Sequence, residues 1–481
     1  NSKGWHQSDG ATDLYNGDPT QFSDAYWPTV DPQRLAGTTT DHSTWDLAAW
    51  GNYTGNANFN GGSAVGVYAN VGMNFRNYSI STNASLNAHK AWFVFDDEIV
   101  AMGSVNGIDS SRTTETIVEN KKINGNNKLV VDGKTTASGI GDTAALTDAH
   151  WAWLEGNNST DAVGYYFPGG TKLNVLREAR TSKWTDINST AGDTAEYTRS
   201  YLSLAVPHGD NTKASLSSFK NEYYSYVLLP SKTQDEVEAY AENPDIEILA
   251  NSSMVQAVRD NKANVTGYLF WGDQGKEIRV GDVGAVKGSV TVVKDAANHT
   301  MTVGMADVHQ TNDSLTFRVY GNGIELISAD DGVTVTPDKS GAKMVVNTAG
   351  AKGKTFTVTL RYRDLTEDET TALATIRENY VNSQTGNNMT DKTDAQYRAV
   401  MDGYTAAAKE ALEHLNRSAG KGTDLFDDIN NQLDWTKGTN NTDGSANLTS
   451  VANRIKAMAL AYASEGCTEY YHSESLKNDI L

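Results

Sequence analysis

Cysteine is almost missing from this chain of 481 residues, in which Cys467 is the single example. One thiol cannot form an intramolecular disulfide or supply a cysteine-based zinc site. Long apolar runs are missing too, since none approaches the roughly 18 residues that span a membrane. A chain of this length builds a core without cross-links, which suits a secreted protein as well as a cytosolic one.

Positive charge is also scarce. The 40 Lys and Arg residues face 60 Asp and Glu residues, so the formal net charge is −20. This balance argues against a nucleic-acid binder and against a basic membrane-surface protein. An acidic protein can still act on a polyanion if a local cleft is basic and rich in amides.

Several common catalytic motifs are absent. The chain has no Gly-x-Ser-x-Gly nucleophile elbow, no phosphate-cradling glycine loop and no His-Glu-x-x-His pair. The histidines at 6, 42, 89 and 208 have no metal-ligand spacing, so we expect structural roles for them. No leader sequence is recognisable in these residues, and because the chain starts at Asn1 without Met we expect a processed or excised piece.

Residues 50 to 365 have a β pattern. Short runs rich in Val, Tyr, Phe and Thr recur between Gly, Asn and Asp turns, as in a large antiparallel sandwich. A helix is expected at Thr233–Ala241, where Thr233 and Glu236 form a capping box. The strands beyond it are more polar and more regular, which predicts a smaller second β-domain.

From Thr366 onward the pattern is helical. Thr366 and Glu369 suit a helix N-terminus, 396–415 is an Ala-rich helix, and Ser450 is expected to cap another. Apolar residues at helical spacing predict a core-facing stripe on each of the three helices. The fold class is therefore mainly β, with a large sandwich at 1–245, a smaller β-domain at 246–365 and a helical segment at 366–481.

The start of the chain is dense in aromatic, amide and carboxylate groups without strand or helix periodicity, which predicts an ordered loop. It contains Lys3-Gly4-Trp5, Tyr15-Asn16-Gly17-Asp18, and Tyr26-Trp27-Pro28-Thr29 followed by Gly37-Thr38-Thr39. In this order these motifs resemble the opening of the β-sandwich half of polysaccharide lyase family 8, the hyaluronate, chondroitin AC and xanthan lyases. The resemblance implies the sandwich wall of a polysaccharide-binding cleft.

The helical segment resembles a different part of the same family. Arg377-Glu378-Asn379-Tyr380, 425–429 and 454–462 are similar to the first helices of the α/α-toroid, which in the family precedes the sandwich. Here these helices follow it. A tandem protein divided across a module boundary, a circular permutation and a reordered chain all remain open.

In these lyases, β-elimination breaks the bond to the 4-oxygen of a uronate. The resemblance implies that an Asn neutralises the carboxylate while a His and a Tyr act as base and acid, with an Arg nearby, all carried by the middle of the toroid. No such set is recognisable here, so we expect no main catalytic residue in this chain. His472 beside two tyrosines lies where the family has a plain helix connection.

Substrate contacts are expected from the opening loops. The resemblance places Asn1 near an asparagine that reaches into the cleft, with Trp5, Tyr26, Trp27 and Arg34 in the same loops. Packing of the aromatic rings against the sheet is the alternative for these residues, and a terminal residue without a role is the alternative for Asn1.

A second set of candidates is Arg177 and Arg180. In xanthan lyases an arginine in this neighbourhood contacts an acidic sugar substituent, and a guanidinium suits a carboxylate through paired hydrogen bonds. A solvated basic strand end is the alternative.

A metal site is the third expectation. Asp96-Asp97-Glu98 follows a strand-like run, and carboxylates are hard ligands suited to calcium. The stretch is similar to one in xanthan lyase where two aspartates and a distant Glu hold calcium, which implies Asp96 and Asp97 with Glu247 as the third ligand. An acidic hairpin turn without metal is the alternative, and no organic cofactor is expected.

Together these features predict part of a secreted, extracellular bacterial lyase that acts on an acidic polysaccharide. A hyaluronan-type glycosaminoglycan is the first expectation and xanthan the second. The expected partners are the polysaccharide and the rest of a toroid, with no nucleic acid and no membrane. The alternative from another class is a non-catalytic carbohydrate-binding β module.

Overall fold

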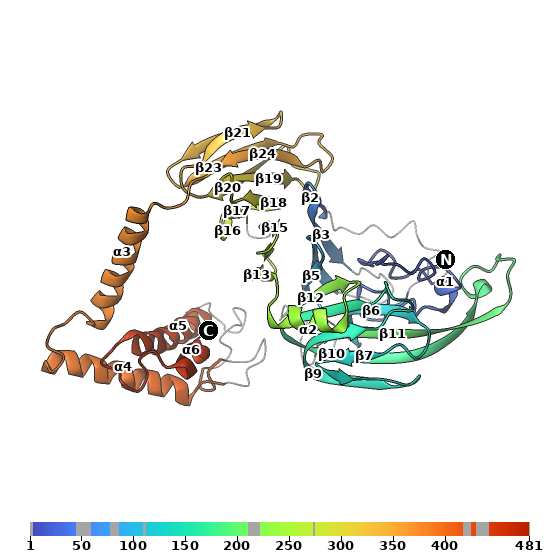
Figure 1. The fold of residues 1–481 in the computed structure, drawn as a ribbon, viewed down its shortest axis with the longest axis horizontal. Coiled ribbons are helices and arrows are strands. Elements are labelled where there is room, and N and C mark those ends of the chain that lie inside the picture. Colours follow the sequence, from blue (N-terminus) through green and yellow to red (C-terminus); the bar gives the residue numbers. More distant parts are fainter. Residues whose placement is uncertain are drawn as a thin grey trace. The chain divides into compact units, whose positions relative to one another are not determined.

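The computed structural model describes residues 3–44, 59–76, 86–108, 112–209, 222–272, 275–416, 425–429 and 442–480. The chain divides into two compact units, Asn1–Asp364 and Leu365–Leu481. The first unit is built from antiparallel strands and the second from helices, so the predicted fold class is confirmed (Figure 1). None of the described helices is long and apolar enough to span a membrane.

The first unit contains a 12-stranded sheet in the order β1-β6-β11-β10-β12-β5-β4-β3-β2, with β9 paired to β10, β7 to β9 and β8 to β7. Its strands are β1 (Thr39–Thr40), β2 (Asn60–Val65), β3 (Tyr68–Arg76), β4 (Asn87–Val94), β5 (Ile99–Asn106), β6 (Thr114–Ile123), β7 (Leu129–Val131), β8 (Lys134–Thr135), β9 (Thr143–Leu154), β10 (Val163–Lys183), β11 (Glu196–His208) and β12 (Glu222–Pro230).

A seven-stranded sheet follows, in the order β13-β14-β15-β18-β19-β24-β21, and packs on a five-stranded sheet in the order β16-β17-β20-β23-β22. The strands of the larger of these sheets are β13 (Ile246–Asn251), β14 (Val255–Asp260), β15 (Val265–Trp271), β18 (Lys287–Asp295), β19 (Thr300–Ala306), β21 (Glu325–Ala329) and β24 (Phe356–Arg361). Those of the smaller are β16 (Ile278–Val280), β17 (Val283–Ala285), β20 (Ser314–Tyr320), β22 (Val333–Asp338) and β23 (Gly341–Asn347).

The 12-stranded and seven-stranded sheets share a core. Phe93 of β4 belongs to the same buried cluster as Leu269 and Trp271 of β15. Beside it the Asn70 amide donates to the carbonyl oxygens of Tyr268 and Val290 at 3.2 and 2.8 Å. Residues 246–364 are therefore packed against the large sandwich as part of one compact unit.

Helix α2 (Gln234–Glu242) joins the two β regions. Its predicted capping box is present, because the Glu236 amide donates to the Thr233 hydroxyl and the Glu236 carboxylate accepts from the Thr233 amide. These bonds satisfy two backbone groups that a helix N-terminus leaves unpaired.

The helical unit contains α3 (Glu367–Thr385), α4 (Ala395–Glu413), α5 (Thr442–Ala463) and α6 (Glu474–Ile480). The capping box of Thr366 and Glu369 is confirmed. The cap at Ser450 is wrong, because α5 begins earlier and the Ser450 hydroxyl bonds to the Ala446 carbonyl inside the helix. The core-facing stripe on α3 is also wrong. Most of its apolar side chains are exposed, including Leu373, Ile376 and Tyr380, whereas α4 and α5 contribute apolar side chains such as Met401 and Met458 to one buried cluster.

Candidate functional site

The opening segment is held on the large sheet by buried polar contacts. Helix α1 (Tyr26–Thr29) lies against β10 and β11. The fully buried Lys90 ammonium of β4 donates to the carbonyl oxygens of Asp9 at 3.1 Å and Gly37 at 2.5 Å. Burial lowers the pKa of Lys90 to about 7, only partly offset by the nearby Asp9 carboxylate. The expected ordered loop is thus fixed from beneath by a lysine that the sequence analysis did not single out.

Tyr26 is a packing residue in this structure. Its side chain is 2% exposed, and its ring meets Phe22 and Trp27 edge-on at 5.2 Å between centroids. The Tyr201 ring lies on another side at 6.1 Å. A buried ring cannot stack on a sugar, so the predicted contact of Tyr26 with substrate is replaced by the packing alternative.

Arg34 is used within the loop–sheet junction. Its Nε and Nη2 donate to the two Glu115 carboxylate oxygens at 2.7 and 3.0 Å, and Nη1 donates to the Ser203 hydroxyl at 3.0 Å. Burial raises the pKa of Glu115, but hydrogen bonds from His42 and Arg34 outweigh this effect and lower the pKa to about 2. This paired guanidinium braces the loop rather than offering a free fork to a ligand.

Arg177 is fully buried. Its guanidinium donates to three carbonyl oxygens, those of Ala137 at 2.5 Å, Gly125 at 2.8 Å and Asn127 at 2.5 Å. The predicted substrate contact of Arg177 therefore does not fit this geometry. Successive side chains of β10 point to opposite faces of the sheet, and Arg177 points toward the face over which the turns of residues 124–139 fold.

Trp27 and Arg180, which were singled out separately, line one pocket of about 100 Å³. Its other polar lining includes Lys3, Gln7, Thr181 and Ser182. The Arg180 side chain is 31% exposed; its Nε donates to the Thr29 carbonyl at 3.0 Å, and its Nη1 lies 3.5 Å from Asp31 and 3.4 Å from Glu178. Strand β10 and the opening loop therefore bring an indole side chain and a partly exposed guanidinium together.

The described lining of this pocket carries no His, Tyr or carboxylate side chain. It can bind sugar and offset negative charge, but it offers no group for proton transfer near neutral pH. Trp5 is half-buried in the same segment, and its contact with substrate stays a prediction. Asn1 lies outside the described residues.

The acidic turn after β4 forms a cluster with different members from those expected. Asp97 and Glu98 lie with Asp245, and one carboxylate oxygen from each falls within 4.8 Å of the others. Asp96 is exposed and is not in the cluster, and Glu247 is paired with Arg259 at 3.3 Å. Of the expected ligands Asp96, Asp97 and Glu247, only Asp97 therefore belongs to this cluster, whose other members are Glu98 and Asp245.

Glu98 is the unusual member of this cluster. Its side chain is buried, and neither carboxylate oxygen has a hydrogen-bond partner among the described residues. Burial and the neighbouring Asp97 and Asp260 carboxylates raise its pKa to about 9. Asp97, in contrast, receives a hydrogen bond of 2.6 Å from Lys232. A buried, unpartnered carboxyl group among other carboxylates fits either a bound proton or a bound cation.

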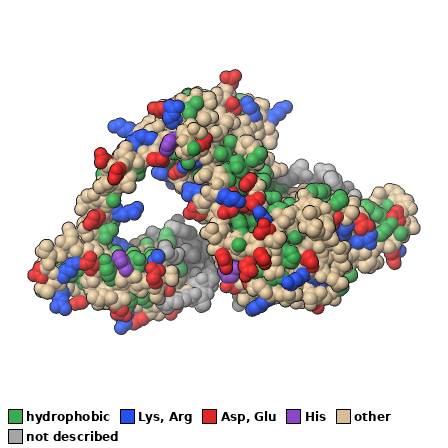
Figure 2. Space-filling model, viewed as in Figure 1, with side chains coloured by type: hydrophobic (Ala, Val, Ile, Leu, Met, Phe, Trp, Pro, Cys, Tyr) green, Lys and Arg blue, Asp and Glu red, His purple; other side chains and the backbone are tan. Residues whose placement is uncertain are grey.

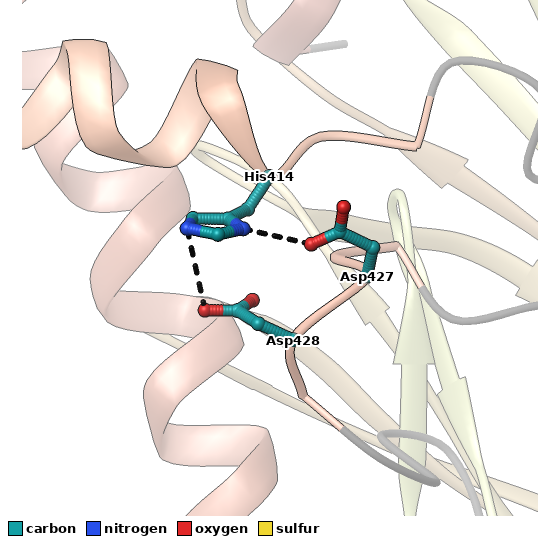
Figure 3. Close-up of side chains that lie close together, drawn as sticks. All are labelled: His414, Asp427 and Asp428. Atoms are coloured by element: carbon teal, nitrogen blue, oxygen red, sulfur yellow. Dashed lines mark hydrogen bonds and ion pairs between the residues drawn. The ribbon is translucent and has the colours of Figure 1, made fainter.

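A second cluster lies in the helical unit (Figure 3). The His414 ring at the end of α4 stands between two carboxylates, with Nδ1 2.7 Å from Asp427 and Nε2 3.8 Å from Asp428. Both Asp428 oxygens also accept hydrogen bonds from Arg454 of α5. Because the carboxylates approach opposite nitrogens and one is already paired with arginine, the arrangement is an ion-pair network that ties α4 to α5.

Comparison with known proteins decides the family. Residues 1–241 match the super-sandwich domain of polysaccharide lyase family 8, and residues 247–316 match its C-terminal β-sandwich domain. The chain belongs to polysaccharide lyase family 8. Neither family match extends into the helical unit.

Individual members of family 8 support this assignment. A xanthan lyase from Bacillus sp. (strain GL1) is 37% identical over 74% of this chain and 37% of its own length. A hyaluronate lyase (HylB) from Enterococcus faecalis is 29% identical over 73% of this chain and 34% of its own length. The chain thus spans about a third of the length of these two relatives.

Solved structures of family 8 lyases agree. A Paenibacillus xanthan lyase superposes with a TM-score of 0.68 at 38% identity, over 76% of this chain and 34% of that one. A Streptomyces coelicolor chondroitin AC lyase in complex with chondroitin sulphate gives a TM-score of 0.61 at 28% identity, over 76% of this chain and 45% of that one. The predicted family resemblance is confirmed.

Proposed function

We propose that this chain supplies the β-sandwich wall of a lyase that cleaves an acidic polysaccharide by β-elimination at a uronic acid and leaves an unsaturated uronate. The observation that carries the proposal is the pocket where Trp27 and Arg180 meet, on a sandwich that belongs to this family. An indole and a guanidinium suit a sugar ring and its carboxylate. The base and acid would come from toroid helices outside this chain.

Xanthan and a hyaluronan-type glycosaminoglycan are the candidate polymers. The xanthan lyases, at 37% and 38% identity, support xanthan, while the hyaluronate lyase at 29% keeps hyaluronan in the test. The experiment mixes this chain with a separately produced α/α-toroid of a family 8 lyase and follows the absorbance of unsaturated uronate on xanthan, hyaluronan and chondroitin. We expect absorbance from the mixture on one polymer and none from either part alone.

A non-catalytic carbohydrate-binding module is the second candidate, supported by the pocket lining that lacks proton-transfer groups. It predicts sugar binding without complementation. Polysaccharide binding by this chain together with no absorbance from any mixture would reject the lyase proposal in favour of this one.

We also propose a structural calcium ion at Asp97, Glu98 and Asp245. The buried Glu98 carboxyl group accepts no hydrogen bond from a described donor and needs a proton or a cation, and calcium prefers oxygen ligands such as those of this cluster. The ion would supply positive charge that keeps Glu98 ionised and ties the β4–β5 turn to the segment before β13. Calcium should raise the melting temperature of the parent but not of Glu98→Gln, with Glu247→Gln as a control that responds like the parent. An equal response of Glu98→Gln and the parent would exclude Glu98 as a ligand.

The location that we propose is extracellular, since polymers of this class are met outside the cell. Immunoblots of culture supernatant and cells of the producing organism test it. Protein confined to the cell fraction would reject it.

A further inference from the structure

One row of side chains crosses the five-stranded sheet. Arg279 of β16 is opposite Gly284 of β17, which is opposite Arg318 of β20. Arg318 is in turn opposite Lys343 of β23, and Lys343 is opposite Thr336 of β22. Directly opposed residues of antiparallel strands share a face, so three cations stand in line across the strands on one side of this sheet.

That side is the outer face of the sheet. The residues that alternate with the row, such as Phe317, Val319 and Met344, are buried in the core shared with the seven-stranded sheet. Arg279 and Lys343 are exposed. Figure 2 shows that Lys and Arg side chains are scattered among acidic ones over the visible surface.

The guanidinium of Arg279 is held in a fixed position. It stacks on the Tyr320 ring with its central carbon 3.8 Å from the ring centroid, and its Nε donates to the Gly281 carbonyl at 3.0 Å. Gly284 makes room for this arrangement, because a Cβ there would lie 3.1 Å from the ring and 2.5 Å from the Glu277 carboxylate that accepts the Tyr320 hydroxyl. Stacking orders the guanidinium in advance and so lowers the entropic cost of binding.

Two of the three cations, Arg279 and Lys343, keep terminal donors that no described acceptor bonds. Arg318 is balanced by Asp338, whose carboxylate oxygens accept from its Nη2 at 2.6 and 2.5 Å. In the described part of the chain, no acceptor bonds the terminal amino groups of Arg279 or the ammonium of Lys343. Three strand spacings separate these two residues, or about 14 Å.

Hydroxyl groups lie beside the cationic row. Thr316, Thr334 and Thr336 are exposed. Thr336 belongs to the row, and Thr316 and Thr334 flank the row two residues along their own strands, so all three lie on this face. An open face with separated cations and free hydroxyls matches an extended polymer that carries both carboxylates and hydroxyls. A compact anion would need convergent donors, whereas Arg279 and Lys343 stand about 14 Å apart.

We propose that the outer face of β16, β17, β20, β22 and β23 is a second polysaccharide-binding surface, on which an acidic glycan lies across the strands with its acidic groups at Arg279 and Lys343. This proposal rests on the proposed function only for the class of ligand, an acidic polysaccharide. The surface uses no residue of the Trp27–Arg180 pocket, and it would keep a long chain attached while another part of that chain is cleaved.

The test measures binding of the whole 481-residue chain to hyaluronan, chondroitin sulphate and xanthan by affinity electrophoresis at two salt concentrations. The test variant is Arg279→Ala/Lys343→Ala. The matched control is Lys134→Ala/Lys352→Ala, which removes two exposed cations from other surfaces of the same unit. We expect the test variant to bind about tenfold more weakly, about threefold for each of the two exposed cations removed, and the control to stay within about twofold of the parent.

Equal affinity of the two double variants, or no binding by the parent to any acidic polymer, would overturn the surface. Equally tight binding of the parent to a DNA oligonucleotide would overturn it as a glycan site. A variant Trp27→Ala/Arg180→Ala should add its loss to that of Arg279→Ala/Lys343→Ala, because separate sites are additive. If mixing with the toroid gives no lyase activity while the variants still differ in polysaccharide affinity, the lyase proposal is rejected and the proposed binding surface is supported.

Discussion

The two arginine-bearing regions of the β unit use the same side chain in opposite ways. In β10 and the opening segment, Arg177 and Arg34 donate to carbonyl and carboxylate acceptors of the protein itself. On the outer face of the five-stranded sheet, Arg279 is stacked on a ring and keeps its terminal donors free. The difference shows that burial and partners, rather than residue type, separate arginines that hold the fold from arginines that are available to a ligand.

The largest expected effect is at Arg177. Arg177→Met keeps the aliphatic stem but leaves three buried carbonyl oxygens without a donor, which should lower the free energy of unfolding by about 3–5 kcal/mol. Arg180→Met, at a partly exposed and screened position of the same strand, should cost less than about 1 kcal/mol. Urea titrations followed by tryptophan fluorescence measure both. Similar losses in the two variants would break the distinction between holding and available arginines.

Lys90 extends the comparison to a lysine. Its pKa is lowered to about 7 in the folded protein, against 10.5 for an ordinary lysine, so between pH 7 and 9 the unfolded chain binds more protons than the folded one. Stability should therefore rise with pH across this window, by up to about 1.4 kcal/mol per pH unit from this group.

Lys90→Met should remove that rise, which urea titrations at pH 7, 8 and 9 would show. Lys134→Met, at an exposed position, is the control and should retain the parental slope. If the stability of the parent and that of Lys90→Met fall equally over this pH range, the Lys90 ammonium stays charged when buried.

The sequence predicted the family, the β class and the capped starts of α2 and α3, because these depend on local motifs and alternation. It did not distinguish Arg177 from Arg180, although the two lie three residues apart. Which of them is buried depends on where the 124–139 turns fold over β10, a long-range contact that no local pattern records. The same holds for Tyr26, whose burial depends on Tyr201 of β11.

Two other misses have physical causes of the same kind. Glu247 was expected to join Asp97, but its strand neighbour Arg259 pairs with it, while Asp245 lies close enough to join the cluster. Ser450 has the residue type of a cap, yet α5 starts eight residues before it, so the Ser450 hydroxyl bonds to the Ala446 carbonyl within the helix. The row of Arg279, Arg318 and Lys343 could be found only from register, since 64 residues separate its ends in the sequence.

The smallest effect concerns the ring beneath Arg279. Tyr320→Leu leaves all three cations in place but removes the surface on which the guanidinium stacks, so polysaccharide affinity should fall about threefold because an unordered arginine loses more side-chain freedom on binding. Tyr320→Phe keeps the stack, loses only the hydrogen bond to Glu277, and should bind like the parent. Tyr362→Leu, which removes a ring near Lys294 on another surface, is the matched control. If Tyr320→Leu binds as tightly as Tyr320→Phe in affinity electrophoresis, charge alone accounts for the surface and the ordering of Arg279 contributes nothing.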